Sequence, residues 1–126
     1  VKASQTISLA TGGAFFVQDA AGGNLAAIDA VGNADIKGTL TQNAEPSADT
    51  NDFVIQSNNG SVNFVITNPE GNLRIRGFLN QSQSSPLTPT LNAFVIQNNT
   101  GNAVAYVNNT GGLFLTGALT ENVLFG

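Results

Sequence analysis

Hydrophobic and polar residues alternate through most of this chain, and the alternation belongs to a unit that occurs three times. The clearest copy reads FVIQNNTGNAVAYVNNTGGLFLTGAL. In every copy a Gln stands three residues after a leading Phe, and a Gly follows four residues later. The copies span residues 15–40, 53–79 and 94–119. Repetition of this kind indicates that one supersecondary unit is used three times.

Each copy contains three short segments with the period-two alternation of β-strands, separated by two polar turns that end on Gly. In the middle copy we place Val62, Phe64 and Ile66 on one face of the second strand, and the one extra residue of this copy in its second turn. The most clearly inward positions of the third strands are Ile36, Ile75 and Leu115. A Gly interrupts each third strand, which predicts a bulge or a close approach of another backbone. Turns this short join antiparallel neighbours, so each copy is predicted to be a three-stranded meander.

One three-stranded sheet cannot bury its apolar face alone, so the three meanders must pack together. The length of 126 residues is that of one domain, which we place at residues 1–126. We predict an all-β fold of about nine or ten strands, built as a β-sandwich or jelly-roll. A three-fold arrangement, either a β-trefoil or a β-prism, is the alternative.

Residues 1–14 precede the first copy and belong to none of the three. Ala3, Gln5, Ile7 and Leu9 alternate with polar residues, which predicts a strand that lacks a hairpin partner in the sequence. The Thr-Gly-Gly that follows is a flexible joint. This strand either joins a sheet of its own chain or is donated to a sheet edge of a neighbouring copy, and we favour donation.

Two polar segments that contain proline, residues 41–52 and 80–93, link the copies and are long enough to cross between sheets. The last residues include Val123, Leu124 and Phe125, which would fray into water unless they dock on something. The start at Val1 is what removal of a signal peptide would leave, and we expect a secreted protein.

Charged residues make up only 10% of the chain, where about a quarter is typical. Either much of the surface is buried in an assembly, or Asn, Gln, Ser and Thr keep it in solution. A net charge of −4 argues against nucleic acid, because phosphate binding needs a basic surface. No apolar run reaches the length of a membrane span, and the absence of Cys excludes disulfides and thiolate metal sites.

The chain has no His and no Cys, which removes the usual general base and the usual assisted nucleophile. The remaining acid–base candidates are the carboxylates Asp19, Asp29, Asp35, Asp49, Asp52 and Glu70. Asp49 and Asp52 beside Asn51 also have the oxygen ligands that Ca²⁺ prefers, but an Asp/Asn-rich turn is the favoured interpretation. We therefore expect no enzyme and no cofactor.

Other candidate contacts lie on predicted outward faces. Arg74 and Arg76 would suit an anionic partner, although such charges more often protect a sheet surface. Phe78 and Phe114 continue the same face and are candidate protein contacts. Four Asn-x-Ser/Thr sequences fall in predicted turns or at a linker, as glycosylation requires. Their acceptor residues are Asn59, Asn80, Asn98 and Asn108.

The repeated unit, F-x-[VI]-Q followed by a Gly turn and ending in G-x-L-x-[IL]-x-G-x-L, resembles β-repeats in secreted surface proteins of archaea and some bacteria. It is also similar to repeats in phage tail fibres. The resemblance implies an extracellular role in a fibre or surface layer and no catalytic residue. The unpaired N-terminal strand resembles, in layout, pilus and thread subunits that polymerise by donor-strand complementation.

These observations predict a structural subunit of an extracellular filament or surface assembly, with other copies of itself as partners. Subunits would join by β-strand addition through the strand that contains Ala3, Gln5, Ile7 and Leu9. The alternative function is an adhesin or tail-fibre module that binds glycans or a surface.

Overall fold

The computed structural model describes residues 1–125, and this part of the chain contains thirteen β-strands and no helix. The three meanders consist of β2 (Ala14–Gln18), β3 (Asn24–Asp29), β4 (Ala34–Ile36), β6 (Phe53–Gln56), β7 (Asn63–Thr67), β8 (Leu73–Ile75), β10 (Phe94–Gln97), β11 (Ala103–Val107) and β12 (Leu113–Leu115). The other strands are β1 (Thr6–Ser8), β5 (Leu40–Thr41), β9 (Leu79–Asn80) and β13 (Leu119–Thr120). The all-β class and the three antiparallel meanders are confirmed.

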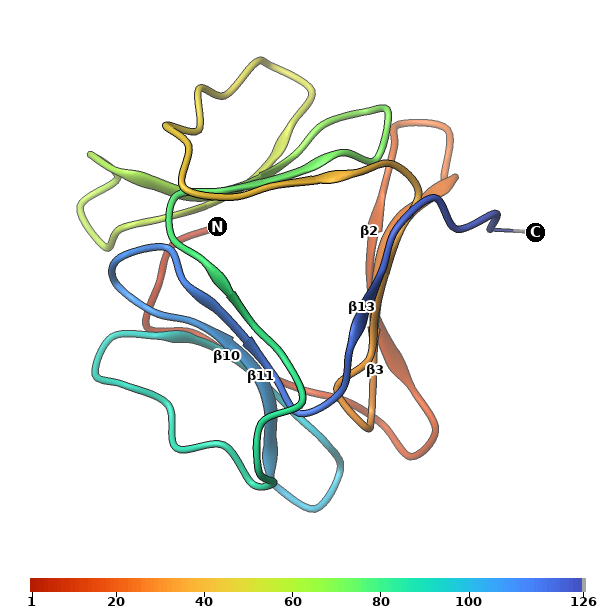
Figure 1. The fold of residues 1–126 in the computed structure, drawn as a ribbon, viewed down its shortest axis with the longest axis vertical. Coiled ribbons are helices and arrows are strands. Elements are labelled where there is room, and N and C mark those ends of the chain that lie inside the picture. The colour runs from red at the N-terminus through yellow and green to blue at the C-terminus, as the bar shows by residue number, and fades with distance from the viewer. Residues whose placement is uncertain (126) are drawn as a thin grey trace.

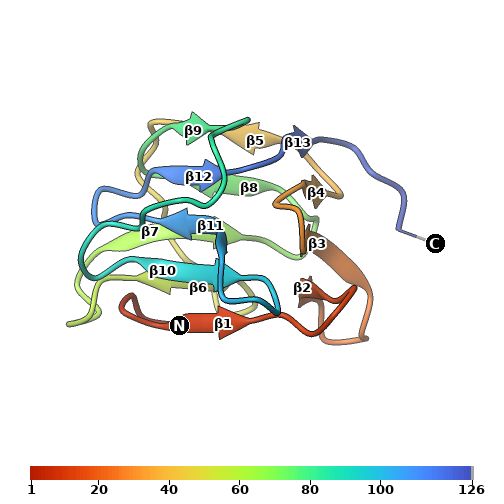
Figure 2. The same cartoon turned by 90° about the horizontal axis from the view of Figure 1, so that it is seen from below.

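The strands form three sheets that face one another around a single core, and viewed down the shortest axis they are the sides of a triangular prism (Figure 1). Their strand orders are β13-β4-β3-β2, β5-β8-β7-β6 and β1-β10-β11-β12-β9. The sheets pack face to face as in a sandwich, but they number three, as in the prism alternative. Figure 2 shows the strands stacked in layers along the prism. We call the end that carries β2, β6 and β10 the base, and the end that carries β5, β9 and β13 the rim.

The rim strands tie the copies together. Each copy ends by crossing to the next sheet, where its last strand pairs in parallel: β5 with β8, β9 with β12, and β13 with β4. The last of these pairings joins the third copy to the first, so the ring is closed. These strands are two residues long and show no alternation, which is why the sequence predicted about nine or ten strands rather than thirteen.

The corners of the prism depend on glycine. At one corner the N–H of Gly77 donates to the carbonyl of Gly111 (3.1 Å), and the other two corners have the equivalent bond. A Cβ on Gly77 would lie 2.7 Å from the backbone nitrogen of Gly112, so no larger residue fits without a shift. The glycine in the third strand therefore marks the close backbone approach that the sequence predicts.

Asp or Asn side chains build the hairpin turns. In the turn after β10, Oδ1 of Asn98 accepts the N–H groups of Thr100 (3.1 Å) and Asn102 (3.0 Å), while Gly101 adopts φ +85°. The same pattern, Asp or Asn followed three residues later by Gly, begins the turns at Asp19, Asp29, Asn68 and Asn108. Each turn thus satisfies its own backbone donors without help from the rest of the fold.

The core lies where the three inner faces meet. Ile36, Ile75 and Leu115, one from each copy, are at most 1% exposed, as the alternation predicts. Nearer the base the ring of Phe15 lies 6.0 Å from the rings of both Phe53 and Phe94. The apolar interior leaves a cavity of only about 60 Å³. Because the inner faces of all three sheets form this core, one copy could not bury its apolar face alone.

The predicted position of the extra residue in the middle copy is wrong, and this changes which face of β7 is the inner one. Ile66 pairs with Val54 and Arg74, so its side chain shares their outward face, whereas Phe53 lies opposite Thr67. In the third copy the matching residue, Phe94, lies opposite Val107, one position earlier in its copy. The extra residue therefore lies before β7, in the first turn. Ile66 is still 3% exposed because residues 42–52 cover this outer face (Figure 1).

Candidate assembly edges and a polar groove

The three base strands β2, β6 and β10 have equivalent sequences, and the N-terminal segment covers two of them. β1 lies parallel to β10, with Thr6 beside Val95 and Ile7 beside Ile96. The N–H of Val95 donates to the carbonyl of Gln5, and the N–H of Leu9 donates to the carbonyl of Gln97, both at 2.8 Å. This is strand addition to a sheet edge, made within one chain.

Residues 1–3 cover β6 in the same manner. The amino group of Val1 donates to the carbonyl of Val54 (2.6 Å). The N–H of Gln56 donates to the carbonyl of Val1 (2.9 Å), and the N–H of Ala3 donates to the carbonyl of Gln56 (2.8 Å). Ser4, at φ 62°, turns the chain from this sheet edge to the next. A segment of three residues is thus enough to hold an edge in this fold.

The predicted assembly strand is therefore placed on edges of its own chain, and a corner at Ser4 divides it. Ala3 and Leu9 are each 6% exposed and belong to the core, while Ile7 is half-buried and Gln5 is exposed. This is one of the two arrangements that the sequence leaves open. The alternation identified the inward residues but gave no sign of the corner.

β2 is the one base strand without such a cover within residues 1–125, where it is the last strand of its sheet and pairs only with β3. The repeat shows which of its groups are free. Val54 and Gln56 on β6 hold residues 1–3 with the main-chain groups that point away from β7, at the edge of the sheet. The equivalent groups of Phe16 and Gln18 on β2 therefore point to the open edge. The side chain of Phe16 is 50% exposed.

The rim, in contrast, is closed by side chains. Oε1 of Gln42 accepts the N–H of Leu79 (2.8 Å), and Oε1 of Gln81 accepts the N–H of Leu119 (3.0 Å). Oε2 of Glu121 accepts the N–H of Leu40 (2.7 Å), which completes the ring. These caps occupy the donors that an added strand would need. No period in the sequence signals them, although Gln or Glu follows each rim Leu by two residues.

A polar groove of about 400 Å³ lies between the outer face of the sheet β5-β8-β7-β6 and the linker that covers it. Its lining consists of Thr39, Thr41, Glu45, Ser47, Asp49, Asp52, Ile66, Asn68, Asn72, Leu73 and Arg74. Hydroxyl, carboxylate, amide and guanidinium groups of this kind can hydrogen-bond to a sugar. The lining contains no aromatic ring on which a sugar could stack.

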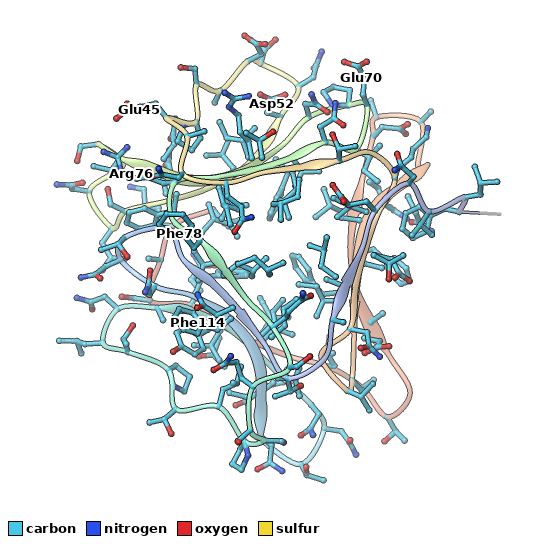
Figure 3. The ribbon with its side chains drawn as sticks, in the orientation of Figure 1. Glu45, Asp52, Glu70, Arg76, Phe78 and Phe114 are labelled. Carbon is cyan, nitrogen blue, oxygen red and sulfur yellow. The ribbon has the colours of Figure 1, made fainter. Side chains whose placement is uncertain are left out.

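In the part of the chain that the structure describes, no three carboxylates gather closely enough to hold a metal ion. Glu45, Asp52 and Glu70 lie apart along one side of the molecule (Figure 3). Asp19 and Asp29 accept backbone N–H groups of their own turns. Oδ2 of Asp52 accepts the N–H of Asp49 (2.8 Å), so these two candidate calcium ligands close a turn.

Of the four candidate contacts on the outward faces, Arg76 and Phe114 have partners within the chain. Arg76 lies 3.5 Å from Glu45, whereas Arg74 faces the groove. Phe78 is 58% exposed, but Phe114 stacks on Tyr106 with ring centroids 4.5 Å apart. Burial raises the pKa of the Tyr106 hydroxyl. Residues 81–92 run along the outer side of this sheet (Figure 1).

The four candidate glycosylation residues differ in how free they are. Asn59 is exposed in the turn before β7. Asn98 and Asn108 are half-buried, and their Oδ1 atoms hold turn N–H groups. Nδ2 of Asn80 donates to the carbonyl of Phe78 (3.1 Å), so the atom that would carry a glycan is engaged. Of the four, Asn59 is the most accessible.

Comparison with known proteins gives no further guide to function. A scan against protein-family models, a search of curated proteins and a search of solved structures each found no match to the chain. Residues 1–125 include no helix long and apolar enough to cross a membrane. The fold and its open edge define the chain as an all-β prism with repeated, strand-accepting edges.

Proposed function

We propose that this chain is a structural subunit of an extracellular filament or surface assembly, in which copies join by β-strand addition at the base of the prism. One observation carries the proposal. The N-terminal segment lies outside the repeat, yet it holds two sheet edges through main-chain bonds to β6 and β10. The protein thus contains both a separable strand and edges that accept one.

Every contact that residues 1–9 make with these edges can also be made with another copy. The receiving groups belong to β6 and β10, which are the same in each chain, so the local free energy of pairing is equal within and between chains. The joint to β2 is a turn closed by the N–H of Gly13 and the carbonyl of Ala10 (2.8 Å), with Gly12 at φ +69°. If this turn opens, the segment can reach a neighbour.

The composition supports an assembly over an isolated subunit. Only 10% of the residues are charged, and one base edge and an exposed Phe16 are left uncovered within residues 1–125. A soluble monomer usually protects such an edge with Lys, Pro or a short strand. β2 has none of these, since its five residues are AFFVQ.

Strand exchange is tested by a disulfide that can form only between chains. Thr6 and Val95 are partners in the β1–β10 pairing, and the chain has no Cys. Neighbouring strands lie about 4.8 Å apart, within the range that a disulfide spans. We expect Thr6→Cys protein mixed with Val95→Cys protein, unfolded and refolded together and then oxidised, to give a covalent heterodimer on a non-reducing gel.

The double variant Thr6→Cys/Val95→Cys is the matched control, because its internal disulfide shows that this pair has suitable geometry. If the double variant closes internally while the mixture stays monomeric at every concentration, the N-terminal strand remains on its own chain. Exchange through this strand would then be wrong.

The second candidate function is a glycan-binding adhesin or tail-fibre module, and the polar groove beside Arg74 is the observation that favours it. Its donors and acceptors suit hydroxyl groups. The missing aromatic platform makes it the weaker of the two, since aromatic rings supply much of the contact area in sites of this kind.

A further inference from the structure

Besides the open edge of β2, the C-terminal tail is also left uncovered by the rest of the molecule. After β13 the N–H of Asn122 donates to the carbonyl of Gly38 and the N–H of Val123 to the carbonyl of Ile36, both at 2.9 Å. The chain then leaves the prism and projects away from it (Figures 1 and 2). Leu124 is 95% exposed, the highest value among the exposed large hydrophobic side chains, and Phe125 follows it.

We propose that the tail of one copy, residues 123–125, adds as a short strand to the open edge of β2 in a second copy. The inference rests on the proposed assembly by strand addition, and it names a second donor and its acceptor. Leu124 would point inward over the base, toward Phe15 and Phe53. These two rings are only half-buried, whereas the equivalent ring of Phe94, beside β1, is 2% exposed. Phe125 would then lie beside Phe16 on the outer face.

The length of the tail is sufficient by the standard of the molecule itself. Residues 1–3 hold the equivalent edge of β6 with three main-chain hydrogen bonds. Phe16 and Gln18 offer the corresponding groups on β2. Strand pairing also tolerates this sequence, because Val, Leu and Phe are all favoured in sheets.

The tail cannot reach β2 of its own chain while Val123 is held to Ile36. β13 and β2 are at opposite edges of one sheet, and three strand spacings of about 4.8 Å separate them. The proposed donor residues beyond Val123, Leu124 and Phe125, span at most about 7 Å. The partner is therefore another copy.

The N-terminal segment of a second copy is a poorer occupant for this edge. It already holds two edges of its own chain, and moving it to β2 would release those bonds for a single edge. The tail gives up nothing of this kind. Because the donor leaves from the rim and the acceptor lies at the base, one copy can use both at once, so the contact is head-to-tail and propagates.

Disulfide trapping tests the pairing in the full-length chain. Phe16→Cys protein mixed with Phe125→Cys protein is expected to form covalent dimers at least about tenfold faster than Phe16→Cys mixed with Thr120→Cys, since only docking raises the local thiol concentration. Thr120 is exposed but fixed on β13. The double variant Phe16→Cys/Phe125→Cys is expected to give a ladder of multimers.

Three results would overturn the inference: equal rates in the two mixtures, rapid dimers from Phe16→Cys alone, which indicate β2–β2 pairing, or an internal disulfide in the double variant without a ladder. A second measurement avoids the loss of either Phe. Leu124→Asp should weaken the self-association of the otherwise unchanged chain in sedimentation, because it removes one of the two proposed donors, whereas Val31→Asp, at another exposed apolar residue (65%), should leave it intact. Equal association of both variants would also reject the tail as donor.

These outcomes are separable from those for N-terminal exchange. A ladder through residues 16 and 125 without a heterodimer through residues 6 and 95 would leave the tail as the only donor. The reverse pattern would leave strand exchange intact and reject the tail.

Discussion

Single side chains at repeated positions hold this fold together, and most of them act on the backbone. In five of the six hairpin turns an Asp or Asn accepts two N–H groups of its own turn, so the turn is stabilised by local hydrogen bonds. The same residues produced most of the candidate chemistry in the sequence. Asp19 and Asp29 were candidate acid–base carboxylates, and Asn98 and Asn108 candidate glycan acceptors; in the structure the side-chain oxygen atoms of all four accept N–H groups of their turns.

The core prediction at the residue scale concerns Ile36, Ile75 and Leu115. Each is almost fully buried in a shared core, so truncation to Ala removes contacts from all three sheets. We expect each substitution to lower the free energy of unfolding by about 2–5 kcal/mol, as for other large-to-small changes in cores. Urea denaturation measures this cost. A loss below about 1 kcal/mol at all three positions would contradict the inward assignment.

The inward residues could be predicted where the alternation was uninterrupted, as in β8 and β12. The phase in β7 could not, because one extra residue in a turn moves every following side chain to the other face. Both faces of that strand carry buried apolar residues, so composition gave no warning: Ile66 is 3% exposed on the outer face and Val65 is 4% exposed on the inner one.

At the scale of strands, the meanders were predictable because their turns are local, whereas the rim strands were not. β5, β9 and β13 are two residues long, and they form strands only because another repeat of the same chain supplies the partner strand. The N-terminal strand was recognised from its alternation. The sequence could not predict which sheet edge this strand pairs with, since the three base strands share one pattern.

The rim caps predict a local change in amide exchange. Gln81→Ala removes the acceptor for the N–H of Leu119, and an exposed hydrogen bond is worth about 0.5–1.5 kcal/mol. The amide of Leu119 should therefore exchange about 2- to 10-fold faster in NMR measurements. Gln83→Ala is the control, because Gln83 is in the same segment but donates to the carbonyl of Gln81. Unchanged exchange at Leu119 in Gln81→Ala would show that the cap does not protect the rim.

At the scale of the whole molecule, the prism has one closed end and one open end. The rim donors are capped and the ring of sheets is sealed by β13, while the base has the open edge of β2 and carries the N-terminal strand for which we propose exchange. The sequence indicated three meanders and one core. The sequence did not decide between a sandwich of two sheets and a prism of three, because that depends on where the short rim strands cross from one sheet to the next.

The low charge is also a property of the whole chain. Four basic and eight acidic residues cannot cover the surface of 126 residues, so either polar amides and hydroxyl groups or contacts with other copies must do so. An assembly in which base edges are filled by neighbouring strands would bury Phe16 and Leu124 together. Such an assembly would explain both the low charge of the chain and its open sheet edge.

Negative-stain electron microscopy of the purified, unmodified protein at high concentration tests the central claim most directly. The account predicts filaments or ordered linear rows whose repeat is one prism, and these should lengthen as the concentration rises. Monodisperse single prisms at every concentration would contradict it.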